Sequence, residues 1–171
     1  MLRAICVALL AAASPLAAEI TESGDDHFTV SHGFSTPADP SAVYRQMIAI
    51  EQWWNPDHSW GGNAANLYID AERGGCFCER LPDGGGVEHL RIIYLAPGRE
   101  IRFEGALGPL QSMAVDGRMI WSIAPADNGS RVTFTYRVFG HSEKGLGGIA
   151  PAVDGVIGEQ ALRLADRLSG D

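Results

Sequence analysis

The middle of the sequence, residues 67–139, constrains the fold more than any other part of it. It is built from short segments with strand-like composition, and turn residues such as Pro82 to Gly86 and Asp127 to Gly129 separate them. The candidate strands are 67–72, 75–81, 87–95, 99–105, 113–124 and 130–139. Strands joined by short turns pair antiparallel, so this region predicts one antiparallel sheet.

Helical patterns flank this region on both sides. Residues 27–35 alternate like a further strand, and Asp39 followed by Pro40 is typical of a helix start. A helix of about four turns is expected from there to Trp54. From Pro151 onward, one apolar stripe indicates a long C-terminal helix: Val153, Val156, Ile157, Gln160, Ala161, Leu164 and Leu168.

A curved sheet with one apolar face needs a cover, and only the C-terminal helix is long enough to supply it. The sequence therefore predicts an α+β fold in which a sheet of about six to seven strands wraps around that helix. Gly155 and Gly158 are unusual inside a helix, since glycine costs about 1 kcal/mol there relative to alanine. We interpret them as positions of close approach to the sheet or of room for a ligand.

The first 18 residues have the pattern of a secretory signal peptide. A basic start at Arg3 precedes an apolar run from Ala4 to Ala13, and small residues end at Ala18. The run is too short to span a bilayer, which takes roughly 20 residues. We expect cleavage after Ala18, one domain over 19–171, a periplasmic or secreted location and no integral membrane segment in the mature chain.

The charge of the chain limits its partners. Removing residues 1–18 takes away one base and no acid, which leaves 12 basic against 21 acidic side chains and a net charge of −9. Phosphate backbones are bound by clustered Lys and Arg, so the sequence excludes nucleic acid as a partner. It leaves the oligomeric state open.

Several segments resemble the START-like, or SRPBCC, helix-grip superfamily, which includes pollen allergens, lipid-transfer START domains and aromatase/cyclase domains. The resemblance covers roughly residues 25–170. It rests on the order of elements and on these segments: Ala38 to Tyr44, Gly74-Gly75, Ala96 to Ile101 and Asn128 to Thr133. The chain also looks like a secreted bacterial subgroup of unknown function with Trp53-Trp54-Asn55-Pro56-Asp57-His58, Gly74 to Glu79 and Gly105 to Gln111 segments. The resemblance implies a hydrophobic-ligand cavity between the sheet and the C-terminal helix, and no particular reaction.

The segment 73–91, with Cys76, Cys78 and His89, predicts a β-hairpin whose register is open. With a turn of two or four residues, Cys78 faces His89 and Cys76 faces Arg91, all on one face. A turn of three or five residues instead places Leu90 and Ile92 beside the cysteines.

Three chemistries fit the hairpin. Cys76, Cys78 and His89, with His58 as a fourth ligand, resemble a zinc-type site, although such sites usually use Cys-x-x-Cys loops. A disulfide needs Cβ atoms near 3.8 Å, whereas residues i and i+2 of a regular strand lie about 6.5–7 Å apart. We therefore favour two buried thiols, with no metal and no cofactor.

The remaining candidates are aromatic and acidic. Trp53, Trp54, His58 and Trp60 cluster in eight residues and suit a pocket mouth, or simply the helix stripe and the open end of the sheet. No Ser-His-Asp pattern accompanies His58. For Glu79 and Glu104 we favour a solvated strand face over a place in the cavity. The predicted ligand lining is Trp53, Trp54, His58, Trp60, Cys76, Cys78, His89, Met113, Trp121 and Tyr136.

The sequence predicts a binding protein for a small hydrophobic or amphipathic ligand held between the sheet and the C-terminal helix. One alternative is an enzyme of cyclase, dehydratase or hydrolase type that uses His58, His89 or Glu79 as acid-base groups. Another is a metal- or thiol-linked sensor. The enzyme alternative requires two of these three side chains to converge on one cavity.

Overall fold

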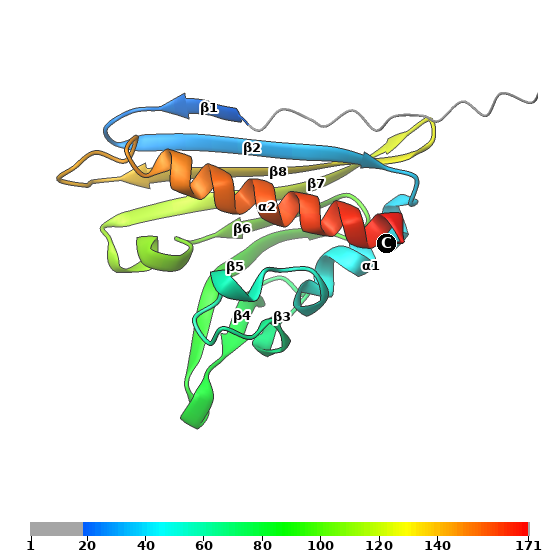
Figure 1. The fold of residues 1–171 in the computed structure, drawn as a ribbon, viewed down its shortest axis with the longest axis horizontal. Coiled ribbons are helices and arrows are strands. Elements are labelled where there is room, and N and C mark those ends of the chain that lie inside the picture. The colour runs from blue at the N-terminus through cyan, green and yellow to red at the C-terminus, as the bar shows by residue number, and fades with distance from the viewer. Residues whose placement is uncertain (1–18, 171) are drawn as a thin grey trace, which may run out of the picture.

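The computed structural model describes residues 19–170, which form one antiparallel sheet of eight strands and two α-helices. The strand order is β1-β2-β8-β7-β6-β5-β4-β3, and the sheet is not closed (Figure 1). The strands are β1 (Glu19–Ser23), β2 (His27–Thr36), β3 (Leu67–Ile69), β4 (Cys76–Arg80), β5 (Gly86–Ala96), β6 (Glu100–Glu104), β7 (Val115–Ala126) and β8 (Gly129–Gly140). From β3 to β8 each strand pairs with the next one in the sequence, as short turns require.

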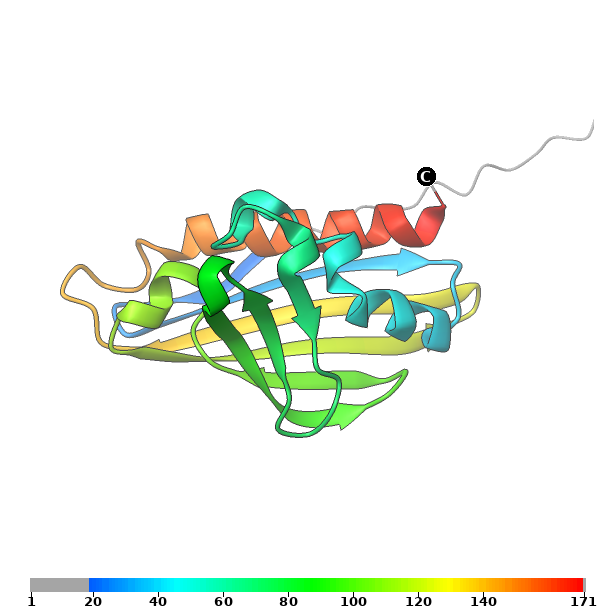
Figure 2. The same ribbon diagram turned by 90° about the horizontal axis from the view of Figure 1, so that it is seen from below.

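Helix α2 (Ala150–Ser169) lies along one face of the sheet, and α1 (Pro40–Ile48) contacts both α2 and strands β7 and β8 (Figures 1 and 2). The Asp39 side chain caps α1 by accepting hydrogen bonds from the backbone N–H groups of Ser41 and Ala42. The predicted N-cap is therefore confirmed. Short 3₁₀ turns complete the chain: η1 (Ile50–Gln52), η2 (Pro56–His58), η3 (Ala64–Asn66), η4 (Pro82–Gly84) and η5 (Gly108–Ser112).

The α+β architecture with a C-terminal helix agrees with the sequence, but two details were wrong. The sheet has eight strands and not six to seven, because β1 adds an edge strand whose only large apolar residue is Ile20. Helix α1 is shorter than the predicted four turns. The chain leaves it at Ala49 and continues as the 3₁₀ turn η1.

The core lies between the sheet and the two helices. Strand β8 shows how it is built, because Val132, Phe134, Tyr136 and Val138 alternate inward and are buried while the residues between them are more exposed. Close approach of α2 to β2 explains one of its glycines. A Cβ atom on Gly158 would lie 2.6 Å from Cε1 of the His32 ring, so a larger residue there would collide with the imidazole. No such contact explains Gly155.

Two predictions concern the ends of the chain and its relation to membranes. The proposed signal peptide falls on residues 1–18, which lie outside the described residues. Within residues 19–170, no helix combines the length and the apolar character needed to cross a bilayer.

Candidate functional site

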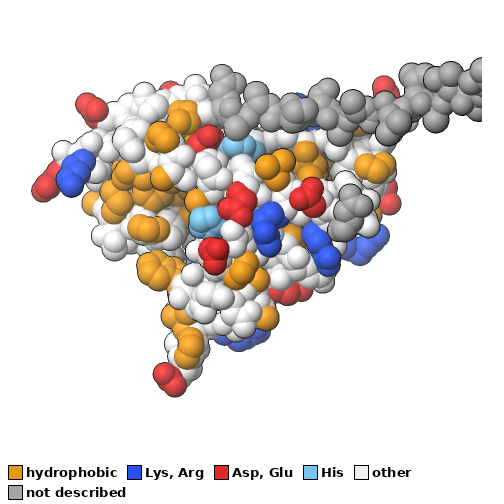
Figure 3. Space-filling view, viewed as in Figure 1, with side chains coloured by type: hydrophobic (Ala, Val, Ile, Leu, Met, Phe, Trp, Pro, Cys, Tyr) orange, Lys and Arg blue, Asp and Glu red, His pale blue; other side chains and the backbone are white. Residues whose placement is uncertain are grey.

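A cavity of about 640 Å³ lies between the N-terminal half of α2, the turn η5, the turn η2 and strand β5. Its wall is mostly apolar. Figure 3 shows hydrophobic side chains gathered at the end of the molecule where α2 begins, and charged groups of both signs over the other half of that helix. The lining residues are Trp54, Asp57, His58, Ser59, Trp60, His89, Leu107, Gly108, Pro109, Leu110, Met113, Ile149, Ala152, Val153, Val156 and Ile157.

Tyr136 holds one wall of the cavity in place. Its hydroxyl donates to the carbonyl of Gly105 at 3.1 Å and accepts from the N–H of Leu107 at 2.9 Å. These bonds fix the segment that leads into η5, which supplies Leu107 to Leu110 to the wall. Burial raises the pKa of Tyr136 well above its ordinary value, so the hydroxyl stays protonated and can make both bonds.

The outer rim of the cavity is polar. His58 contacts Glu159 of α2, with 3.1 Å between Nε2 and Oε2, and the Asn55 side-chain amide donates to the other oxygen of the same carboxylate. The side chain of His58 is 33% exposed, and Trp60 beside it is 55% exposed. These contacts tie η2 to α2 and leave an aromatic ring and an imidazole at the opening.

The inner wall depends on a β-bulge in the β4–β5 hairpin. Cys76 pairs with Arg91 and Phe77 with Leu90, but Cys78 pairs with Glu88, so His89 is the extra residue of β5. In an unbroken register His89 would face Cys78, as one prediction had it. The bulge instead sends the His89 ring to the other face, where it packs against the Phe77 ring in a tilted arrangement with 4.6 Å between ring centroids.

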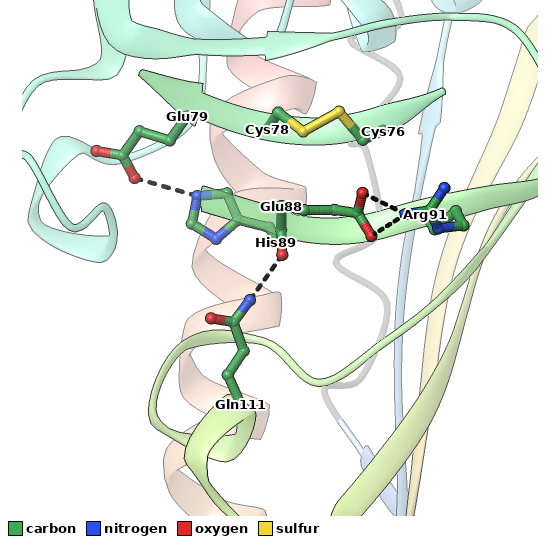
Figure 4. The surroundings of a disulfide bond; sticks show 7 residues. All are labelled: Cys76, Cys78, Glu79, Glu88, His89, Arg91 and Gln111. Carbon is green, nitrogen blue, oxygen red and sulfur yellow. Dashed lines mark hydrogen bonds and ion pairs between the residues drawn. A yellow bond between two sulfur atoms is a disulfide. The ribbon is translucent and has the colours of Figure 1, made fainter. Parts of the chain in front are cut away.

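His89 and Glu79 form a buried polar pair beside the cavity. Nε2 of His89 lies 3.1 Å from Oε2 of Glu79 (Figure 4). The Glu79 carboxylate also accepts the backbone N–H groups of Trp60 and Gly61. Glu79 is 1% exposed, so the expectation of a solvated strand face was wrong for this residue. Glu104 fits it, since its side chain is 41% exposed. Burial lowers the pKa of His89, while Glu79 acts in the opposite direction.

The two cysteines are bonded to each other (Figure 4). By the alternation of strand β4 they lie on the face opposite to Phe77 and Glu79. Their Cα atoms are 5.4 Å apart, closer than the spacing in a regular strand that led us to expect free thiols. That expectation was wrong. The zinc-type site considered as an alternative is not assembled, since the cysteines are bonded to each other and His89 faces the other way. No group of three or more His, Cys, Asp and Glu side chains suited to a metal ion occurs within residues 19–170.

The structure divides the predicted ligand-lining residues into two groups. Five of them lie in the cavity wall: Trp54, His58, Trp60, His89 and Met113. Five do not line this cavity: Trp53, Cys76, Cys78, Trp121 and Tyr136. Trp53, Trp121 and Tyr136 are fully buried core residues, and the cysteines are on the outer face of the sheet.

Sequence reasoning did not place the α2 residues and Asp57 in the wall. The stripe of Val153, Val156 and Ile157 was recognised as the buried face of a helix, and only the structure shows that its first turns face a cavity. The sequence signal for this was the mixture of small and aliphatic residues at that end of the stripe. The Gly105 to Gln111 segment, which carries part of the family resemblance, supplies four lining residues.

Comparison with known proteins identifies the fold alone. No protein-family model matches the sequence, and no curated protein matches it. Among solved structures, an uncharacterized protein from Rhizobium leguminosarum is 21% identical with a TM-score of 0.57, and the match covers 86% of this chain and 99% of that one. The Aha1 dimer from Colwellia psychrerythraea is 16% identical with a TM-score of 0.57, covering 82% and 96% of the two chains. Protein Ms6760 from Mycobacterium smegmatis is 16% identical with a TM-score of 0.56, covering 90% and 99%.

These likenesses, all below 25% identity, agree with a helix-grip-like arrangement of a sheet and a C-terminal helix.

Proposed function

We propose that this chain is a periplasmic or secreted binding protein for a small hydrophobic or amphipathic ligand, and that the ligand occupies the cavity under the first half of α2. The observation that supports this most directly is the cavity itself. Its volume of about 640 Å³ falls within the range of roughly 300–1,000 Å³ typical of small-molecule sites. Its wall is apolar except for a few polar groups, which is also typical of such sites.

The wall has the features that favour an amphipathic guest. Val153 and Val156 are only partly buried although they point from the helix toward the sheet, so their remaining apolar surface is available to a ligand. Trp60 adds a largely exposed ring at the rim. A bound hydrocarbon body would remove this surface from water, while the polar rim stays hydrated.

The experiment is a fluorescence titration with N-phenyl-1-naphthylamine, a neutral dye that brightens in apolar sites. The wild-type protein should give a saturable increase. Val156→Trp, which fills the cavity from α2, should weaken binding at least tenfold. Leu162→Trp makes the same kind of change on the outward face of the same helix, where Leu162 is 63% exposed, and should leave the titration unchanged. Equal titrations for the two variants, or no saturable binding by the wild type, would contradict the proposal.

A second candidate is the acid-base enzyme, and one observation favours it. His89 and Glu79 lie within hydrogen-bonding distance beside the cavity, and His58 lines the same cavity. An imidazole oriented by a carboxylate is the arrangement used in general base catalysis. The two functions are separated by incubating the protein with ligands that displace the dye and measuring the masses of the recovered ligands by mass spectrometry. A carrier returns them unchanged, whereas an enzyme alters one of them and His89→Gln abolishes the change.

A further inference from the structure

One ring nitrogen in the apolar wall, Nδ1 of His89, has no hydrogen-bond partner among the described residues. His89 lines the cavity, and its Nε2 is engaged with Glu79, but its Nδ1 makes no hydrogen bond to any described residue. Within residues 19–170, two fully buried side-chain polar atoms have no hydrogen-bond partner: Nε1 of Trp121 and Nε2 of Gln160. Nδ1 of His89 is not one of them, so this atom is not fully buried, and the space that the His89 ring borders is the cavity.

The surroundings of His89 set which ring nitrogen has the proton. The Glu79 carboxylate accepts the N–H of Trp60 at 2.9 Å and that of Gly61 at 2.6 Å, and an ionised carboxylate can only accept hydrogen bonds. Nε2 of His89, 3.1 Å from the same carboxylate, is therefore the donor. In a neutral imidazole the other nitrogen is then an acceptor with a free lone pair.

Two further features keep this acceptor available. The His89 ring is fixed on its other side by Phe77, with the two ring planes 31° apart, so Nδ1 has a defined direction. Burial lowers the pKa of His89, and this favours the neutral ring that has a lone pair to offer.

The charged groups near the cavity disfavour anions. Asp57 lines the wall, Glu159 is paired with His58 at the rim, and Glu79 lies behind His89. Among the cavity-lining residues there is no Lys or Arg to neutralise a carboxylate. A fatty acid anion entering head first would meet Glu79 and an acceptor nitrogen, neither of which can donate a hydrogen bond to it.

We infer that the cavity selects an uncharged amphiphile whose polar end is an O–H donor, an alcohol or a phenol, with the O–H donated to Nδ1 of His89. The apolar body then lies between η5 and the first turns of α2. This inference rests on the proposed binding function and names the class of ligand that the site takes.

Three probes of one shape test it by displacement of N-phenyl-1-naphthylamine: 4-hexylphenol, 4-hexylanisole and 4-hexylbenzoate. The anisole keeps the ring and the chain but has no O–H to donate. One neutral hydrogen bond predicts that the wild type binds the phenol about 3- to 10-fold more tightly than the anisole. The benzoate, which is an anion at neutral pH, should bind more weakly than both.

Variants assign the preference to one ring nitrogen. In His89→Phe, which keeps a ring on Phe77, the phenol and the anisole should bind equally. In His58→Phe the preference should persist whatever the change in affinity, because the contact of His58 is with Glu159. Should His89→Phe fail to fold, ¹⁵N NMR of the wild-type imidazoles gives the same information, since the phenol should shift the His89 Nδ1 resonance and the anisole should not.

Each outcome has a separate meaning. If none of the probes displaces the dye and the dye itself does not bind, the proposed function fails. If phenol and anisole bind equally well to the wild type, the binding function stands and the inference about the O–H donor is overturned. It is also overturned if the benzoate binds best, or if His58→Phe and not His89→Phe removes the preference.

Discussion

The two halves of α2 cover very different parts of the same sheet. Under its C-terminal half, which we call the packed end, Trp53, Trp121 and Phe134 fill the space with rings. The Trp121 and Phe134 rings stack with 4.9 Å between their centroids, and the ring centroids of Trp53 and Trp121 are 5.7 Å apart. Under its N-terminal half, the open end, the sheet and the helix enclose the cavity of about 640 Å³.

The two ends differ in packing because their side chains differ in size and because hydrogen bonds hold one loop in place at the open end. At the packed end, Trp53, directly after η1, packs with the rings of Trp121 from β7 and Phe134 from β8. The helix is also tied there by Arg163, which donates to the carbonyl of Trp53 at 2.7 Å. At the open end, α2 presents Ala152, Val153, Val156 and Ile157, and the Tyr136 hydroxyl holds the η5 segment in the wall. One helix thus packs against a filled core at one end and lines a cavity at the other.

The largest expected effect separates the two ends by stability. Phe134→Ala at the packed end leaves a closed cavity in a fully buried core and should lower the free energy of unfolding by about 3–5 kcal/mol. Val153→Ala at the open end only enlarges existing space and should cost about 1 kcal/mol or less. Urea unfolding measures both. Similar losses for the two variants would contradict the division into a packed and an open end.

The next effect concerns the polar pair of the open end. Glu79→Leu leaves buried His89 without its partner, whereas the N–H groups of the exposed residues Trp60 and Gly61 can bind water instead. One unpaired buried group costs about 1–3 kcal/mol, so the loss should be about 3 kcal/mol at most. The control is Glu104→Leu on β6, where a half-exposed carboxylate lies 3.7 Å from Arg118. Its cost should be about 0.5 kcal/mol or less. Equal costs would show that the Glu79 contacts add nothing to stability.

A smaller effect is expected from the disulfide on the outer face of the open end. Replacing Cys76 and Cys78 by serine removes a cross-link that closes only a very short loop, and loop-closure entropy predicts a loss of about 1.5 kcal/mol. Since the cysteines do not line the cavity, dye affinity should stay the same. Thiol titration of unreduced mature protein should find no free thiol. Loss of dye binding in the double variant would show that the disulfide on the outer face of the sheet affects the cavity on its inner face.

The smallest effect is a pH dependence at the inner wall. Burial lowers the pKa of His89 in the folded state below its ordinary value of 6.5. The unfolded chain then takes up a proton at a higher pH than the folded one. The associated stability is therefore complete above pH 6.5 and is lost as the pH falls from there toward the folded pKa. The decrease in unfolding free energy from pH 7.5 to pH 5.5 should be smaller in His89→Gln than in wild type. An identical decrease would remove His89 as its source.

The sequence by itself determined the framework. Turn residues between short alternating segments led to an antiparallel sheet in sequential order, Asp39 and Pro40 marked the start of α1, and the apolar stripe after Pro151 marked α2. These features depend on local chemistry: backbone preferences, capping and periodicity. The edge strand β1 was missed because local pattern is weak in a short strand with one large apolar residue.

Only the tertiary structure decided which predicted residues share the site. A single extra residue in β5 turns His89 away from the cysteines and toward Glu79, and no local signal in residues 73–91 indicates that bulge. Likewise, a tryptophan pattern cannot distinguish Trp53, which fills the packed end, from Trp54, which lines the open end. Side-chain direction in a sheet reverses with a one-residue shift, so the composition of the wall depends on register and on how far apart α2 and the sheet are held.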